Sequence, residues 1–166
     1  MTAGPRQYTP SQLTSFLFVT PSYVPLVGGA RTFLENIGQR LAADGHSVTV
    51  LTTTARRTGD FWQPPGSSRA SLPARETLGG VRVERLSLMY PWPAPYTFGV
   101  LRRASYWIHR SGLPAAIQQR LLKSLGGWMP PMAGLQAALA ELTPEADLVQ
   151  AVDCFESLGV SAIVAK

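Results

Sequence analysis

The sequence predicts an α/β protein built on an open parallel sheet with helices on both faces. Residues 16–19 are a continuous apolar run, which is typical of a strand buried on both sides. Residues 30–44 repeat apolar side chains at helical spacing, and a second strand-like run follows at residues 48–51. A strand, a helix of about four turns and a strand this close together predict parallel pairing through a crossover.

The composition predicts one globular domain. The 166 residues are 45% apolar and only 15% charged, so the chain can bury a sizeable core. Residues 1–15 are a polar lead-in that we expect to be disordered, which leaves residues 16–166 as the domain. The net charge of +5 is carried almost wholly by arginine. It suits an anionic ligand, a nucleotide or an acidic membrane surface, and equally a solvated basic surface.

Several classes of protein are excluded. Cys154 is the lone cysteine, which rules out an internal disulfide and fits a reducing, cytoplasmic setting. With one cysteine and two distant histidines, His46 and His109, we expect no metal site. The chain has neither the run of about 18–20 apolar residues of a membrane-spanning helix nor the apolar core of a signal peptide.

The first helix is expected to begin near Ala30 and to end before Gly45, which suits a C-terminal cap. Residues 55–80 are irregular and rich in Arg, Pro, Gly and Ser. This is long for a connection inside a domain, so we expect a mobile loop near a site or a disordered segment. Gly79-Gly80 ends it, and residues 81–86 alternate as a half-exposed strand should.

Residues 89–140 contain no Asp or Glu and mix basic with aromatic residues. Helices are expected at residues 98–110, 114–125 and 132–142. Basic residues among aromatics on short helices suit a membrane surface or an anionic acceptor, while helices packed on the sheet with Arg facing water explain the same residues. Residues 147–152 then read as another buried strand, with Asp153 at its C-terminal end and helix-spaced residues after it.

The glycine pair Gly28-Gly29 follows the first strand, at the end of the sheet where open α/β proteins bind ligands. A dinucleotide site needs G-x-G-x-x-G and an acid after the second strand, where this chain has only residues 52–54, all threonine. No Gly-Lys dipeptide exists for a triphosphate loop. There remain a generic anion site at a helix N-terminus and glycines that merely permit a tight turn with positive φ. Arg31 would meet a phosphate or solvent.

The run PSYVPLVGGARTFLENIGQRLAADGHSVTVLT resembles the start of family-4 glycosyltransferases, which have two Rossmann-like domains in the GT-B arrangement. The matching residues are Pro21, Tyr23, Pro25, Gly28, Gly29, Leu41, Ala42, Gly45, His46, Val48, Val50, Leu51 and Thr52. Residues 80–83 and 147–166 look like a later strand and a strand with its following helix. Residues 88–142 resemble the family only weakly, because this part varies there with the acceptor.

The resemblance implies sugar transfer from a nucleotide-diphosphate sugar to a sugar or lipid-linked acceptor in carbohydrate biosynthesis, without metal or other cofactor. The chain would be the N-terminal, acceptor-side half. Its loop with Tyr23, Gly28, Gly29 and Arg31 would approach the donor phosphates. We expect the family's C-terminal donor-binding domain to be absent from this chain, and therefore expect no activity from this chain alone. We expect a cytoplasmic enzyme with no nucleic-acid partner. The basic and aromatic composition of residues 89–140, and not the resemblance, suggests peripheral contact at the inner membrane face.

Two departures from the family pattern stand at the end of the chain. Gln150 and Val152 replace the histidines of an H-x-H pattern that members often carry. Asp153 is then the candidate catalytic residue, in contact with a sugar hydroxyl or the acceptor, or else a cap for the next helix. His46 is expected to be structural. The alternative function is a truncated, non-catalytic homologue that acts as a binding or membrane-surface interaction module.

Overall fold

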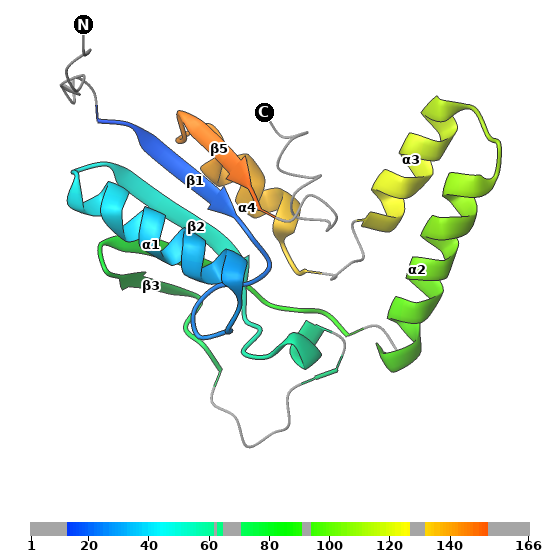
Figure 1. Cartoon of the computed structure of the whole chain (residues 1–166), viewed down its shortest axis with the longest axis horizontal. Helices are drawn as coiled ribbons and strands as arrows, with labels where there is room; N and C mark the ends of the chain where they lie inside the picture. The colour runs from blue at the N-terminus through cyan, green and yellow to red at the C-terminus, as the bar shows by residue number, and fades with distance from the viewer. Residues whose placement is uncertain (1–12, 62, 65–70, 91–93, 127–131, 153–166) are drawn as a thin grey trace, which may run out of the picture.

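The computed structural model describes residues 13–61, 63–64, 71–90, 94–126 and 132–152, which form an α/β domain with a five-stranded sheet (Figure 1). In chain order the elements are β1 (Ser15–Val19), α1 (Gly29–Ala43), β2 (Ser47–Thr53), the 3₁₀ turn η1 (Thr58–Phe61), β3 (Arg75–Leu78), β4 (Val81–Leu86), α2 (Ala94–Arg110), α3 (Ala115–Gly126), α4 (Leu135–Leu142) and β5 (Leu148–Ala151). The described part of the chain thus contains the predicted strand–helix–strand unit.

The sheet is mixed and mostly parallel, with the strand order β3-β4-β2-β1-β5. The parallel pairing of β1 with β2 is confirmed, with Phe18 opposite Val50. The expectation of an entirely parallel sheet is wrong, because β3 runs antiparallel to β4. Gly79 and Gly80 connect these two strands and have positive φ angles of 56° and 82°. A two-residue turn of this kind reverses the chain into a hairpin.

Helices cover both faces of the sheet, as predicted. Phe18 of β1 packs in a core cluster with Leu34 of α1. Its neighbours Leu17 and Val19 belong to a second cluster, with Leu139 of α4. Successive side chains of a strand point to opposite faces, so α1 and α4 lie on opposite sides.

Helix α1 is tightly fixed to the sheet. It ends in a glycine cap, since Gly45 has a φ of 92° and the N–H of His46 donates to the carbonyl of Leu41 at 3.0 Å. In its middle, a Cβ added at Gly38 would lie 3.4 Å from Cγ2 of Val81 and 3.7 Å from a methyl of Val48. The absence of a side chain therefore lets the helix axis lie close to the strands.

Helices α2 and α3 stand beside the sheet and pack mainly against each other (Figure 1). We call residues 94–126 the helical hairpin, and the remaining described residues the sheet body. The two predicted helices are confirmed: α2 begins four residues before the predicted range 98–110, and α3 is shifted by one residue from the predicted range 114–125. The alternative in which the helices of residues 89–140 pack on the sheet holds for α4, and the contacts of α2 and α3 are mainly with each other.

Three further expectations need correction. The predicted lead-in over residues 1–15 is too long, because Ser15 begins β1 and its N–H donates to Oδ2 of Asp147 at 2.8 Å. Residues 55–80 are not irregular throughout, since they include η1 and β3. The strand after Asp147 is not fully buried, because β5 is an edge strand and Gln150 is exposed. Asp153 and the helix expected after it lie outside the described residues.

Candidate functional site

The glycine loop, residues 20–28, lies where the strand order reverses. Strands β2 and β4 lie on one side of β1, and β5 lies on the other. The loop leaves the carboxyl end of β1 and leads into α1. Open α/β sheets bind ligands outside the carboxyl ends of their strands at such a reversal point. The topology therefore places the sequence-predicted loop at the preferred ligand position of this sheet.

The base of the loop is held by the sheet body. The hydroxyl of Thr53 donates to the carbonyl of Pro21 at 2.8 Å. The N–H of Leu26 donates to the carbonyl of Tyr23, also at 2.8 Å, and closes a turn. The Leu26 side chain is buried in a cluster with Phe61. In contrast, Val27 at the tip is 85% exposed, so a fixed base presents an accessible tip.

Arg85 on β4 connects the loop to the β3–β4 hairpin. Its side chain is 1% exposed. One guanidinium nitrogen donates to the carbonyl of Val24 at 2.8 Å, and the other pairs with Glu76 at 2.5 Å. This role of Arg85 was not predicted, because the alternating pattern of residues 81–86 indicated a half-exposed strand. The Gly-Gly turn was the available signal, since a hairpin there places Glu76 diagonally across from Arg85.

Neither the backbone conformation nor crowding requires glycine at Gly28, which ends the loop, or at Gly29, which begins α1. Gly28 is extended, with φ 177° and ψ 157°, and Gly29 begins α1. A Cβ added at either residue would meet no atom of the described residues within 4 Å. The explanation by a tight turn with positive φ is therefore wrong for this pair. No side chain caps the N-terminus of α1, and the first N–H groups of a helix have no partner within the helix.

Tyr23 lies beneath the loop and not at its tip. It is 2% exposed and packs with Phe18 and Leu34. Among the described residues its hydroxyl has no hydrogen-bond partner. Burial raises the pKa of Tyr23, Glu35 raises this pKa further, and Arg31 and Arg85 lower it. Tyr23 thus shares a buried polar region with three charged residues.

Arg31 is turned along its own helix. Its Nη2 lies 2.9 Å from Oε2 of Glu35, and both side chains are half-buried. Phosphate and solvent were the two partners expected for Arg31. In the structure it pairs with Glu35, with which a phosphate would have to compete. At the other end of β1, His46 accepts a hydrogen bond from the N–H of Thr14 at 3.2 Å and packs edge-on against Phe16. These contacts are those of a structural histidine.

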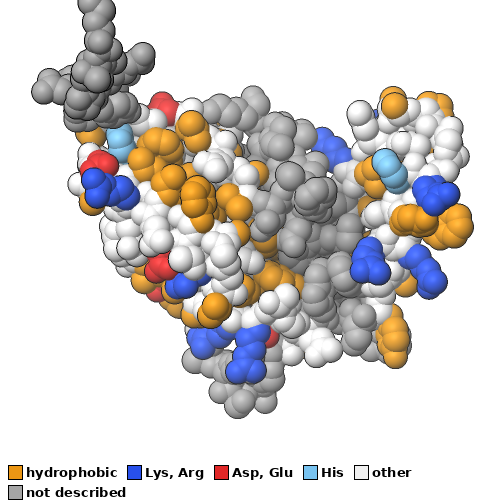
Figure 2. All heavy atoms as spheres, in the orientation of Figure 1, with side chains coloured by type: hydrophobic (Ala, Val, Ile, Leu, Met, Phe, Trp, Pro, Cys, Tyr) orange, Lys and Arg blue, Asp and Glu red, His pale blue; other side chains and the backbone are white. Residues whose placement is uncertain are grey.

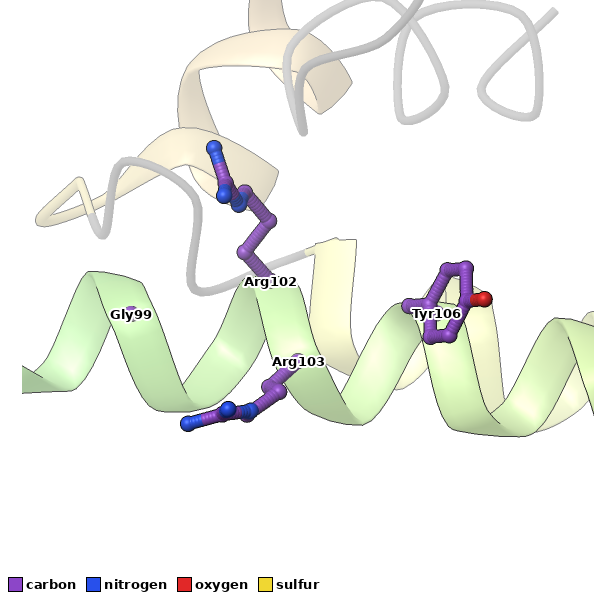
Figure 3. A pocket seen from close by; sticks show the side chains of 4 residues that line it. All are labelled: Gly99, Arg102, Arg103 and Tyr106. Atoms are coloured by element: carbon purple, nitrogen blue, oxygen red, sulfur yellow. The ribbon is translucent and has the colours of Figure 1, made fainter.

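Apart from the glycine loop, a hollow lies on the helical hairpin. It has a volume of about 810 Å³, and its lining includes Gly99, Arg102, Arg103 and Tyr106 among the described residues. Figure 3 shows Arg102 and Tyr106 rising from the same side of α2, while Arg103 projects below the helix. A smaller recess of about 80 Å³, which includes Ser15 and Ser47, lies at the amino ends of β1 and β2. That recess is at the opposite edge of the sheet from the glycine loop.

Within the described ranges, no group of three or more His, Cys, Asp or Glu side chains is arranged to hold a metal ion. In the same part of the chain, no helix combines the length and apolar character needed to cross a membrane. Comparisons with models of protein families, with curated proteins and with solved structures gave no match. The site must therefore be interpreted from its own residues.

Proposed function

We propose that this chain is the acceptor-side half of a glycosyltransferase that uses a nucleotide-diphosphate sugar, within a Rossmann-like domain of a GT-B enzyme. The observation that carries the proposal is the glycine pair at the strand-order reversal. The fold leaves room for side chains at Gly28 and Gly29, yet has none there. The missing side chains are best explained by a group outside this chain that approaches the backbone. The family-like run from Pro21 to Thr52 supports the same assignment.

A diphosphate suits this position on physical grounds. The unpaired N–H groups and the positive end of the α1 dipole attract an anion. Glycine permits the close approach that these short-range interactions need. When the sugar leaves the donor, negative charge develops on the diphosphate, and fixed dipoles aimed at that charge lower the barrier. Arg85 and Thr53, which hold the loop base, would keep those dipoles in place.

The acceptor would lie on the other side of the site. The hollow on α2 presents Arg102 and Tyr106 together. Guanidinium groups suit a phosphate-bearing acceptor because they form paired hydrogen bonds with it. We therefore assign an anionic, lipid-linked sugar acceptor to this hollow within the proposed enzyme. Asp153 remains the candidate for contact with a sugar hydroxyl, at a position that follows β5.

The assignment is tested with the protein extended through its natural downstream sequence. We expect that protein to hydrolyse or transfer sugar from nucleotide sugars. The proposal assigns donor binding mainly to a second domain, so we expect the 166-residue chain alone to show no turnover. A downstream sequence without a second α/β domain would contradict the proposal. Turnover by the isolated chain would contradict the division of the site into two halves.

The glycine pair provides a sharper test in the extended protein. Gly28→Val should reduce kcat/KM roughly a hundredfold, because it removes close contact with charge that develops in the transition state. The variant should remain folded, with a loss of about 1 kcal/mol from the poorer N-cap. Gly29→Ala should leave stability unchanged or raise it slightly while still lowering activity.

Gly59→Val is the matched control, since a Cβ there also meets nothing within 4 Å and φ is not positive. It lies in η1 and not in the loop. We expect its activity to stay within about twofold of wild type, because Gly59 is exposed and lies outside the loop, although η1 packs against the loop base through Phe61. Equal activity losses in the Gly28 and Gly59 variants would show that the pair has no special role.

A non-catalytic binding module is the second candidate. The exposed amide Gln150 on β5 favours it, because members of the resembling family often carry histidine at this point of the strand. This candidate predicts that the extended protein binds a nucleotide sugar or an acceptor without consuming it. Product formation above the uncatalysed rate would remove it.

A further inference from the structure

The helical hairpin carries the whole net charge of the chain. Residues 94–126 contain Arg102, Arg103, Arg110, Arg120 and Lys123 and no acidic residue. The remaining ten basic residues are matched by ten acidic ones. In Figure 2 the acidic side chains on the visible face lie over the sheet body, and the lobe formed by α2 and α3 carries basic and hydrophobic side chains. The excess of five positive charges is thus gathered on one projecting element.

The outer face of α2 combines these charges with exposed aromatic residues. Tyr96, Val100, Arg103, Trp107 and Arg110 are spaced alternately by four and three residues, so they share one face of the helix. All five are exposed, and Trp107 is 65% exposed. The half-buried residues Leu101, Ala104 and Ile108 lie on a neighbouring face of the helix. The exposed face of α2 is therefore not covered by packing against α3.

Helix α3 repeats the pattern. Ile117, Leu121 and Ser124 recur on one exposed face, with Arg120 beside them. Gln118, Leu122 and Leu125 are half-buried on another face, consistent with the packing of the two helices against each other. Each helix thus presents apolar side chains flanked by positive charge to its surroundings.

We infer that the helical hairpin docks on the surface of an anionic lipid bilayer. Aromatic and aliphatic side chains insert at the level of the lipid headgroups, while Arg and Lys extend to their phosphates. Each basic residue near such a surface adds to the attraction, and acidic residues, which would oppose it, are missing here. A second copy of the chain is a poorer occupant, because two like-charged faces repel. The inference stands independently of the proposed sugar transfer.

The charge of the hairpin is tested with the full chain and sedimented vesicles. We expect binding to vesicles of phosphatidylcholine with phosphatidylserine, little binding to pure phosphatidylcholine, and weaker binding as salt is added. Arg103→Glu/Arg110→Glu should weaken binding roughly tenfold or more. The control Arg40→Glu/Arg57→Glu changes the net charge equally, on exposed residues of the sheet body, and should bind like wild type.

The apolar part is tested separately with Trp107→Ala, which keeps every charge and should weaken vesicle binding severalfold by removing an inserted ring. Circular dichroism establishes that each variant is folded. Three outcomes would overturn the inference: no binding of the wild type to anionic vesicles, equal losses in the two double variants, or a concentration-dependent dimer that only the hairpin variants dissociate. The last outcome would assign the face to a second copy.

Discussion

The sheet body and the helical hairpin use arginine in opposite ways. In the sheet body, Arg31, Arg75 and Arg85 pair with carboxylates of the same chain. In the hairpin, Arg102, Arg103 and the other basic residues are exposed and have no carboxylate within the same segment. Charge therefore contributes to internal structure in one region and remains available for recognition in the other. Substitutions should change stability in the sheet body and binding in the hairpin.

The strongest test of this comparison is Arg85→Met. The substitution removes the hydrogen bond to Val24 and leaves Glu76 without its close partner. We expect the free energy of unfolding to fall by about 2–3 kcal/mol, measured by urea denaturation. Arg40→Met is the control, because its side chain is 81% exposed and lies 3.6 Å from Asp44. The control should lower the free energy of unfolding by less than about 0.5 kcal/mol. Equal losses in the Arg85 and Arg40 variants would contradict a structural role for the buried arginine.

A smaller effect of opposite sign is expected for Tyr23→Phe. The buried hydroxyl has no partner among the described residues, so its removal should raise the free energy of unfolding by about 1 kcal/mol at neutral pH. Burial raises the pKa of Tyr23 above the ordinary 10.0. The unfolded chain then loses this proton first, so stability is present below pH 10 and falls as the pH rises toward the folded-state value.

Urea denaturation measured from neutral to alkaline pH checks the predicted loss of stability that the raised pKa of Tyr23 causes. The Phe variant should lose less stability than wild type on the alkaline side. The stability of the Phe variant should still decrease with pH to some extent, since burial and Asp60 also raise the pKa of Tyr90. A destabilised variant at neutral pH would indicate that the Tyr23 hydroxyl has a partner beyond the described residues.

The smallest stability effect is expected in the hairpin. Trp107→Ser removes a largely exposed ring whose centroid lies 6.0 Å from that of Tyr106. Thermal unfolding should show a loss of less than about 0.5 kcal/mol, although binding to anionic vesicles should weaken. A loss near that of the Arg85 variant would mean that Trp107 packs against the rest of the protein, and the distinction between the two regions would fail.

The sequence was sufficient for the elements with strong local patterns. The β1–α1–β2 unit and both hairpin helices follow from apolar spacing within single segments. The position of the Gly28-Gly29 loop at the carboxyl end of β1 was predictable for the same reason. Strand β3 was missed because its four residues, RETL, are mostly polar and lie in a segment whose composition resembles a loop.

The interior of the site was not predictable from local pattern. Arg85 is buried because a distant segment, the glycine loop, covers it, and only the tertiary structure brings the two together. Tyr23 matches a motif that suggests a ligand contact, yet hydrophobic packing places it below the loop. Arg31 is paired with Glu35, a helical neighbour four residues away. That spacing was visible in the sequence and was a usable signal.

The close packing at Gly38 sets how near α1 lies to the sheet, and thereby the position of its N-terminus. A Cβ added at Gly38 would already be in van der Waals contact with Val48 and Val81, and Gly28 lies about 15 Å along the axis from that point. A larger residue at position 38 would tilt the helix axis and move the N-terminal amides of α1 away from their present position. The alignment of the loop therefore depends on a residue that no ligand there would touch, and its accuracy is set from inside the core.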